Sequence, residues 1–242
     1  MTLAYGHRGA RALAPENTLA GFRLALELGV DGVELDVHLS KDGHVVVIHD
    51  PQVGRTTNGR GWVKHLTLAE LRTLEASAEH AGRFPGERIP TLEESLELLK
   101  GRCRAAVELK KESPAALAPA IEVIRRVGME SSCSLLSFSP GLIREAARLA
   151  PEIERELIVV FPLGQVLRAR SAGASMLDVP DLFVTRGVIE RAHAAGLRVG
   201  TGITNDRRKM QRLVEAGVDS LYTDRPDLLV PLVKGRGSRL EG

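Results

Sequence analysis

Two hydrophobic periods alternate along this chain, and together they predict a regular succession of strands and helices. Runs with a period of two are typical of strands, and apolar residues three or four apart are typical of amphipathic helices. The predicted strands are residues 3–7, 33–38, 105–109, 133–138, 157–161, 175–179, 198–202 and 218–223. The predicted helices are residues 17–28, 91–100, 114 onward, 140–149, 164–170, 185–195, 206–216 and 226–233.

Helix-start and helix-end residues support these boundaries. Asn17 or Thr18 is expected to cap the first helix, and Gly29 to end it. Thr91 has Glu94 three residues later, which is the capping-box pattern of a helix start. The alternation is therefore supported by local chemistry as well as by periodicity.

Eight strands that are each followed by a helix predict an α/β fold, a (β/α)8 TIM barrel, rather than an open doubly wound sheet. The length of 242 residues suits one such domain. We expect the barrel to span residues 1–234. Residues 235–242 are charged and contain glycine, and we expect them to form a disordered tail.

One stretch interrupts the alternation after the second strand. Asp42-Gly43 is a hairpin turn signal, so residues 45–50 should return antiparallel to residues 33–38. A segment rich in Gly, Arg and Thr follows, at about residues 51–90. We interpret it as a small insertion between the second strand and the second helix.

Composition restricts the classes of partner. The net charge is +2 and no block of lysine and arginine precedes the tail, so neither nucleic acid nor a stable membrane association is favoured. No signal-peptide pattern or membrane-spanning apolar run is visible, and a cytoplasmic protein is expected. Cys103 and Cys133 lack metal-ligand spacing and are interpreted as small buried residues. The oligomeric state stays open.

Three acidic residues fall on two neighbouring predicted strands. Glu34 and Asp36 are two positions apart and so share one face, and Glu108 lies on the next strand of the barrel. Ion pairs, such as Glu108 with Lys110, are one interpretation. However, acids that face one lumen repel one another and raise each other's pKa, which a cation relieves. Three carboxylates without a thiolate favour Mg²⁺ or Ca²⁺ over Zn²⁺.

Histidines and cations lie beside these acids at the strand ends, where barrel active sites are found. His7 ends the first strand and His49 ends the returning hairpin strand, and the pair fits a general base and a general acid. A structural role is the alternative for either histidine alone. Arg8 and Lys110 would supply positive charge to a phosphoryl oxygen.

These motifs resemble the glycerophosphodiester phosphodiesterases in order and over nearly the whole chain. The matching segments are residues 7–9, 15–18, 34–37, 42–43, 49–50, 89–94, 107–110, 137–138 and 223–226. The resemblance implies a barrel with a small insertion, a divalent metal, and phosphate binding by Arg8 and Lys110. It also implies hydrolysis of glycerophosphodiesters to sn-glycerol 3-phosphate and an alcohol such as choline, ethanolamine or glycerol.

One position departs from the family pattern. Gly202 stands where members of the family usually carry a tryptophan, so a wider pocket for the glycerol or the alcohol is expected. Two alternatives remain: a phospholipase D-like barrel that acts on lysophospholipids, and a non-catalytic barrel that binds phosphodiesters. The second would be expected to have lost a histidine or an acid, and the chain keeps them all. Water or the neighbouring glycerol hydroxyl could be the nucleophile.

Overall fold

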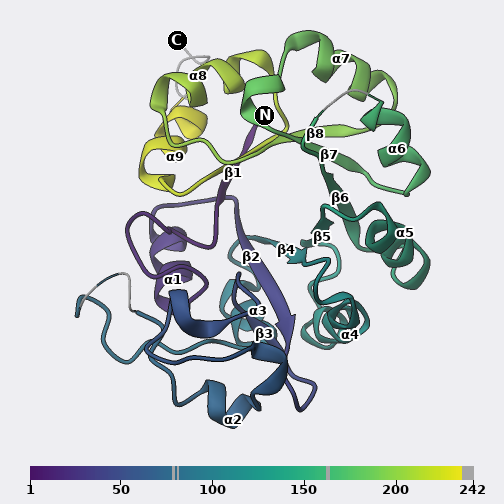
Figure 1. The fold of residues 1–242 in the computed structure, drawn as a ribbon. Helices are drawn as coiled ribbons and strands as arrows, with labels where there is room; N and C mark the ends of the chain where they lie inside the picture. Colours follow the sequence, from purple (N-terminus) through teal and green to yellow (C-terminus); the bar gives the residue numbers. More distant parts are fainter. Residues whose placement is uncertain (78–79, 81, 162–163, 236–242) are drawn as a thin grey trace.

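The predicted barrel is confirmed by a computed structural model, which describes residues 1–77, 80, 82–161 and 164–235. Parallel strands follow one another around the barrel, and β1 pairs with both β2 and β9 to close it (Figure 1). The barrel strands are β1 (Leu3–Gly6), β2 (Gly32–Leu39), β4 (Arg104–Leu109), β5 (Cys133–Ser137), β6 (Glu154–Ile158), β7 (Met176–Val179), β8 (Arg198–Thr201) and β9 (Ser220–Thr223).

Helices surround the strands, and several begin at the cap residues that the sequence indicates. Thr18 and Thr91 accept hydrogen bonds from the first turns of α1 and α3, and Thr91 with Glu94 forms the predicted capping box. The helices outside residues 51–90 are α1 (Leu19–Glu27), α3 (Leu92–Leu99), α4 (Leu117–Val127), α5 (Pro140–Leu149), α6 (Gln165–Ser171), α7 (Arg186–Ala194), α8 (Arg207–Ala216) and α9 (Pro226–Lys234). The 3₁₀ turn η5 (Asp181–Phe183) precedes α7.

One edge of β2 serves two partners in succession. β1 pairs with the start of β2, at Gly32 and Val33. The short strand β3 (Val45–Val47) pairs antiparallel with the end of β2, as the Asp42-Gly43 turn predicts. The hairpin therefore extends β2 past the barrel and returns the chain to the barrel mouth.

The segment after β3 packs a small hydrophobic cluster of its own. It contains η1 (Val53–Arg55), η2 (Val63–His65) and α2 (Leu68–Leu71). The buried members of the cluster are Val46, Ile48, Val53, Val63, Leu71, Ala76 and Ile89. This segment lies beside the barrel on the side of β2 and β3 (Figure 1).

Among the predicted barrel strands and helices, two have boundaries that differ from the structure by three residues. β6 covers Glu154–Ile158, three residues before the predicted strand, because the apolar run at 157–161 continues past the sheet. Buried Glu156 lies inside this strand, whereas Val160 and Phe161 are exposed beyond it. The predicted helix start at Pro114 is a 3₁₀ turn, η4 (Pro114–Ala116), before α4.

The barrel separates two hydrophobic regions. Most buried apolar side chains lie between the strands and the helices, as Val33, Leu35 and Val37 of β2 do. A smaller cluster formed by Tyr5, Ala106, Leu136 and Tyr222 lies apart from it. Within the described ranges, no helix combines the length and the apolar character needed to cross a membrane. Of the predicted tail, residues 235–242, Gly235 caps α9, and residues 236–242 lie outside the described part of the chain.

Candidate active site at the barrel mouth

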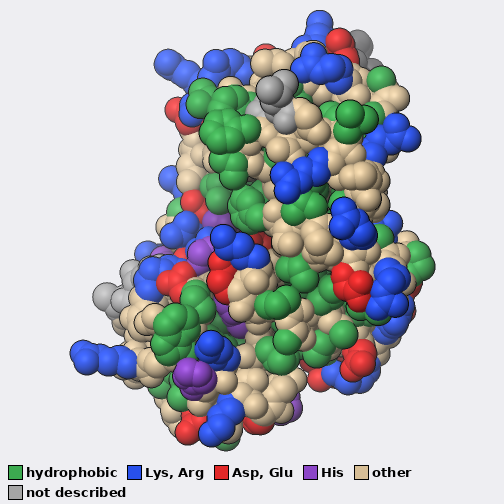
Figure 2. All heavy atoms as spheres, turned by 45° about the vertical axis from the view of Figure 1, so that its right-hand side comes forward, with side chains coloured by type: hydrophobic (Ala, Val, Ile, Leu, Met, Phe, Trp, Pro, Cys, Tyr) green, Lys and Arg blue, Asp and Glu red, His purple; other side chains and the backbone are tan. Residues whose placement is uncertain are grey.

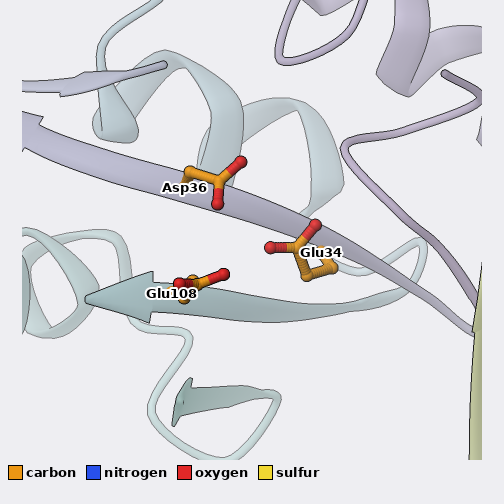
Figure 3. A group of neighbouring side chains, drawn as sticks. All are labelled: Glu34, Asp36 and Glu108. Carbon is orange, nitrogen blue, oxygen red and sulfur yellow. The ribbon is translucent and has the colours of Figure 1, made fainter. Parts of the chain in front are cut away.

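Three carboxylates meet between two neighbouring strands of the barrel. Glu34 and Asp36 project from the same face of β2, and Glu108 lies beside Asp36 in the register of β2 and β4 (Figure 3). One oxygen of each acid lies within 4.8 Å of the others, and all three residues are buried. The structure therefore brings together the three acids that the sequence analysis singles out for a metal.

The electrostatics of these acids favour a bound cation. Burial raises the pKa of Glu34 well above its ordinary value, with added repulsion from Asp36 and Glu108. Burial and the charge of Asp36 raise the pKa of Glu108 to about 7, against the opposing effect of Lys110. Glu34 Oε1 is buried without a hydrogen-bond partner. An oxygen-rich group with an unpartnered carboxylate oxygen suits a hard divalent cation.

Asp36 is the acid that the neighbouring cations hold ionised. Lys110 Nζ lies 2.5 Å from Asp36 Oδ1 and 2.6 Å from Glu108 Oε1, and Arg8 Nε lies 3.2 Å from Asp36 Oδ2. Burial opposes ionisation, yet Lys110 and Arg8 outweigh it and lower the pKa of Asp36. Asn17 Nδ2 donates a hydrogen bond of 2.8 Å to Asp36 Oδ2. The predicted phosphate-binding cations thus lie among the acids.

His7 is fixed by a carboxylate that directly follows the last strand of the barrel. Its Nδ1 lies 2.6 Å from Asp224 Oδ1, and its Nε2 lies 3.9 Å from Glu34 Oε2. Asn205 Nδ2 donates to the other oxygen of Asp224 at 2.7 Å. Burial lowers the pKa of His7 although Asp224 opposes this shift. Because a carboxylate only accepts, Nδ1 carries the proton and Nε2 is left as an acceptor.

His49 has the same arrangement on the hairpin. Its Nδ1 lies 2.6 Å from Asp50 Oδ1, and His38 Nε2 lies 3.0 Å from its backbone carbonyl oxygen. Arg55 joins Asp50 to Glu16, with contacts of 2.7 Å to each carboxylate. Burial lowers the pKa of His49, while Asp36 raises it. Both histidines therefore present a neutral ring with Nε2 available near neutral pH.

Backbone conformation contributes to the site at two positions. Arg8 has a φ of 50° and Asn17 a φ of 55°, in the left-handed region that non-glycine residues rarely adopt. The turn at Arg8 lets its own backbone N–H donate to Glu34 Oε2 at 2.9 Å. Asn17 uses its turn to bond both the carboxylate and the backbone N–H of Asp36.

All seven predicted site residues gather at this end of the barrel, with several partners that the sequence analysis did not assign. Those partners are Asp224, Asn205, Asp50, Arg55, Glu16 and Asn17. Asp50 and Asp224 each lie in a segment that resembles the family, residues 49–50 and 223–226, and this resemblance could have marked both as site residues. Nothing in the sequence indicated which acid would pair with which histidine.

A cavity of about 620 Å³ opens beside the acids. His38, His49, Glu108 and Lys110 line one side of it. Gly202, predicted to widen a pocket, lies past β8, where an added Cβ would lie 3.6 Å from Pro180 Cα; it does not line this cavity. The widening stays a prediction.

Comparison with known proteins gives one consistent result. The model of the "Glycerophosphoryl diester phosphodiesterase family" matches residues 7–228. The chain is 37% identical to a "Glycerophosphodiester phosphodiesterase" of Caldanaerobacter subterraneus, covering 98% of this chain and 99% of that protein.

Solved structures agree with the sequence relatives. A glycerophosphodiester phosphodiesterase from Agrobacterium tumefaciens has 36% identity and a TM-score of 0.85, covering 95% of this chain and 99% of that one. An Oleispira antarctica phosphodiesterase, solved in complex with the product sn-glycerol-3-phosphate, has 30% identity and a TM-score of 0.90, covering 97% of both chains.

Proposed function

The chain belongs to the glycerophosphoryl diester phosphodiesterase family, and from this premise we propose that it hydrolyses glycerophosphodiesters to sn-glycerol 3-phosphate and an alcohol with the help of a divalent cation. The observation that carries the proposal is the buried group of Glu34, Asp36 and Glu108 beside His7 and His49. The product bound in the Oleispira antarctica relative supports the choice of sn-glycerol 3-phosphate.

The three acids would hold the cation, either Mg²⁺ or Ca²⁺. The buried Glu34 Oε1, which has no hydrogen-bond partner, and the repulsion among the acids both fit that role. When bound, a divalent cation acts as a Lewis acid on the phosphoryl group and offsets the negative charge that develops there. Within the described part of the chain, this group offers three carboxylates and no thiolate that would favour zinc.

Arg8 and Lys110 bind the phosphate from the side of Asp36. The guanidinium of Arg8 is held by Glu16 at 2.9 Å, and the ammonium of Lys110 is held by Asp36 and Glu108. These contacts fix both cations before substrate arrives. Fixed positive groups stabilise the charge that builds on the phosphoryl oxygens without a cost of reorganisation.

His7 and His49 transfer the protons. The nucleophile's oxygen forms a bond to phosphorus while the bond from phosphorus to the leaving alcohol's oxygen breaks. One histidine takes the nucleophile's proton on Nε2. The other binds a proton at Nε2 once the anionic phosphodiester lies beside it and raises its pKa, and it gives this proton to the leaving alkoxide. Asp224 and Asp50 keep Nδ1 of each ring engaged, so that Nε2 is the atom that exchanges the proton.

Removal of the metal tests this proposal. Exhaustive dialysis against EDTA should abolish release of sn-glycerol 3-phosphate from glycerophosphocholine, and added Mg²⁺ or Ca²⁺ should restore it. The cation should also raise Tm by about 5–10 °C at a hundredfold excess over its Kd, because it binds only the folded protein.

The variant Glu34→Gln should lose most of that rise in Tm, because it removes one ligand charge. Glu190→Gln, an exposed change on α7, serves as the matched control and should keep the full rise. Turnover that persists after chelation would remove the metal from the proposal. A cation-induced rise that Glu34→Gln leaves intact would place the metal elsewhere.

A further inference from the structure

Exposed hydrophobic side chains gather at one part of the barrel mouth. Among the described residues, eight large hydrophobic side chains are exposed, and five of them lie within three residues of the carboxyl end of β5, β6, β7 or β8. These five are Phe138, Val160, Phe161, Leu182 and Ile203, and the exposed fraction of each residue's surface is 46–78%. Scattered exposed apolar residues are ordinary, but a group at a functional opening indicates a binding surface.

Part of this group belongs to the cavity of the active site itself. The cavity of about 620 Å³ is lined by His49, Glu108 and Lys110 of the site and also by a set of apolar side chains, here called the apolar wall. The apolar wall consists of Phe138, Pro140 and residues 158–161. Figure 2 shows a run of hydrophobic side chains that leads to a group of histidine, acidic and basic side chains. One continuous cavity thus joins Lys110, one of the two predicted phosphate-binding cations, to an apolar surface.

The size and lining of the cavity limit what can occupy it. A volume of about 620 Å³ lies within the range that holds drug-sized ligands. The ring of Phe161 also contacts that of Phe183, with centroids 5.6 Å apart, which supports the wall from η5. A small polar alcohol such as glycerol would remain solvated and gain little from such a wall, whereas a hydrocarbon chain would leave water by lying on it.

The charges around the cavity also disfavour a cationic head group on the wall. The cavity is lined by three cations and two acids: Lys110, Lys111 and Arg168, against Glu108 and Glu112. Lys111 lies 3.8 Å from Glu112, and Arg168 lies on α6 beyond the wall. The aromatic rings of Phe138 and Phe161 could attract a quaternary ammonium, but aliphatic side chains make up most of the wall and offer no such attraction.

We propose that the preferred substrate is a glycerophosphodiester that carries a hydrocarbon chain, with the phosphate at Arg8 and Lys110 and the chain on the apolar wall. This inference rests on the proposed function and names the substrate class of the same site. The chain can belong to an acyl group on the glycerol, as in a lysophospholipid, or to the leaving alcohol.

The reaction is the same hydrolysis with either source of the chain. Water's oxygen bonds to phosphorus and gives one proton to one histidine, the bond between phosphorus and the leaving alcohol's oxygen breaks, and the alkoxide takes a proton from the other histidine. A lysophosphatidylcholine then yields choline and lysophosphatidate. A glycerophosphoalkanol yields a long-chain alcohol and sn-glycerol 3-phosphate.

Three substrates kept below their micelle concentrations test the proposal: sn-glycero-3-phosphocholine, octanoyl-lysophosphatidylcholine and sn-glycero-3-phospho-1-octanol. The expected kcat/KM with added Mg²⁺ or Ca²⁺ is at least tenfold higher for one or both chain-bearing diesters. Hexanoyl and octanoyl homologues should differ by about two- to fourfold per methylene, the gain from burying part or all of that group. The favoured diester identifies which end of the substrate lies on the apolar wall.

Variants connect the preference to the wall. Phe161→Ser should lower the ratio of kcat/KM for the chain-bearing diester to that for glycerophosphocholine at least fivefold, and Phe161→Leu should restore most of it. Leu167→Ser is the matched control, because Leu167 is exposed on α6 but does not line the cavity. It should leave the ratio unchanged.

The outcomes separate this inference from the proposed function. Hydrolysis of glycerophosphocholine without any chain preference would overturn the inference and leave the proposed function intact. If no diester were hydrolysed, the proposed function would fail. Calorimetric binding of octylphosphocholine would then decide the inference: binding that Phe161→Ser weakens would support it, and absence of binding would overturn it.

Discussion

The two histidines of the site reach the same chemical state through different surroundings. His7 is almost fully buried at the end of β1 and depends on Asp224, a residue 217 positions away in the chain. His49 is half-buried on the hairpin and depends on its immediate neighbour Asp50. Burial lowers both histidine pKa values. Each ring is therefore neutral near pH 7 and accepts a proton at Nε2.

Replacement of either histidine tests these roles. His7→Ala and His49→Ala should each lower kcat by about 10²–10⁴-fold, the usual contribution of a positioned proton-transfer group. His193→Ala is the matched control, because His193 lies on α7 with its ring paired to Asp219 rather than near the acids. It should retain normal kcat. Steady-state rates on glycerophosphocholine, with folding checked by circular dichroism, make the comparison. Near-normal kcat in His7→Ala or His49→Ala would exclude that residue from proton transfer.

The sequence predicted which residues of the site lie together where spacing along one strand or one hairpin determines it. Glu34 and Asp36 share a face because a strand has a period of two, and the Asp42-Gly43 turn signal accounts for the return of His49. The pairing of His7 with Asp224 was not predictable, because it depends on closure of the barrel between β1 and β9.

At the scale of elements, β1 and β3 bring parts of the site together by pairing with the same edge of β2. β1 brings His7 to the start of the shared edge, and β3 delivers His49 to its end. Periodicity and cap residues predicted the other barrel strands and helices nearly at their observed positions. The bounds of β6 were predicted three residues too late, because Glu154 and Glu156 make its first half polar while the apolar run continues into exposed Val160. A polar residue that faces the barrel interior breaks the apolar alternation by which a strand is predicted.

The capping box of α3 gives a prediction at this scale. The Thr91 hydroxyl oxygen accepts a hydrogen bond from the Glu94 N–H, and the Glu94 carboxylate accepts one of 2.8 Å from the Thr91 N–H. Thr91→Ala should lower the free energy of unfolding by about 1–2 kcal/mol, because α3 packs its buried face on the barrel. Urea unfolding measures the change.

The equivalent cap of α2 provides the comparison. Thr67 forms the same box with Glu70, but on a helix of four residues that buries only Leu71. Thr67→Ala should therefore cost less than Thr91→Ala. Equal losses would show that the packing of α3 adds nothing to its cap.

At the scale of the whole molecule, the barrel interior carries acids beyond those of the site. Glu156 accepts a hydrogen bond of 2.8 Å from the hydroxyl of Tyr222. Asp178 Oδ1 is buried without a hydrogen-bond partner, and a Cβ on Gly200 would lie only 2.4 Å from it. Burial, followed by the charges of Glu156 and Glu108, raises the pKa of Asp178 well above its ordinary value. The interior is therefore stabilised when Asp178 is protonated.

This proton makes the stability of the metal-free protein depend on pH. The unfolded chain releases the Asp178 proton near pH 4, whereas the folded chain holds it to a higher pH. Unfolding thus releases a proton in this window, and stability falls as the pH rises, by at most about 1.4 kcal/mol per pH unit for one group. Asp178→Asn mimics the protonated acid and should flatten the decline. In EDTA, urea unfolding at pH 5 to 8 should show the variant gaining on the wild type as pH rises, while Glu190→Gln follows the wild type. Parallel curves for Asp178→Asn and wild type would mean that Asp178 is ionised in the folded protein throughout.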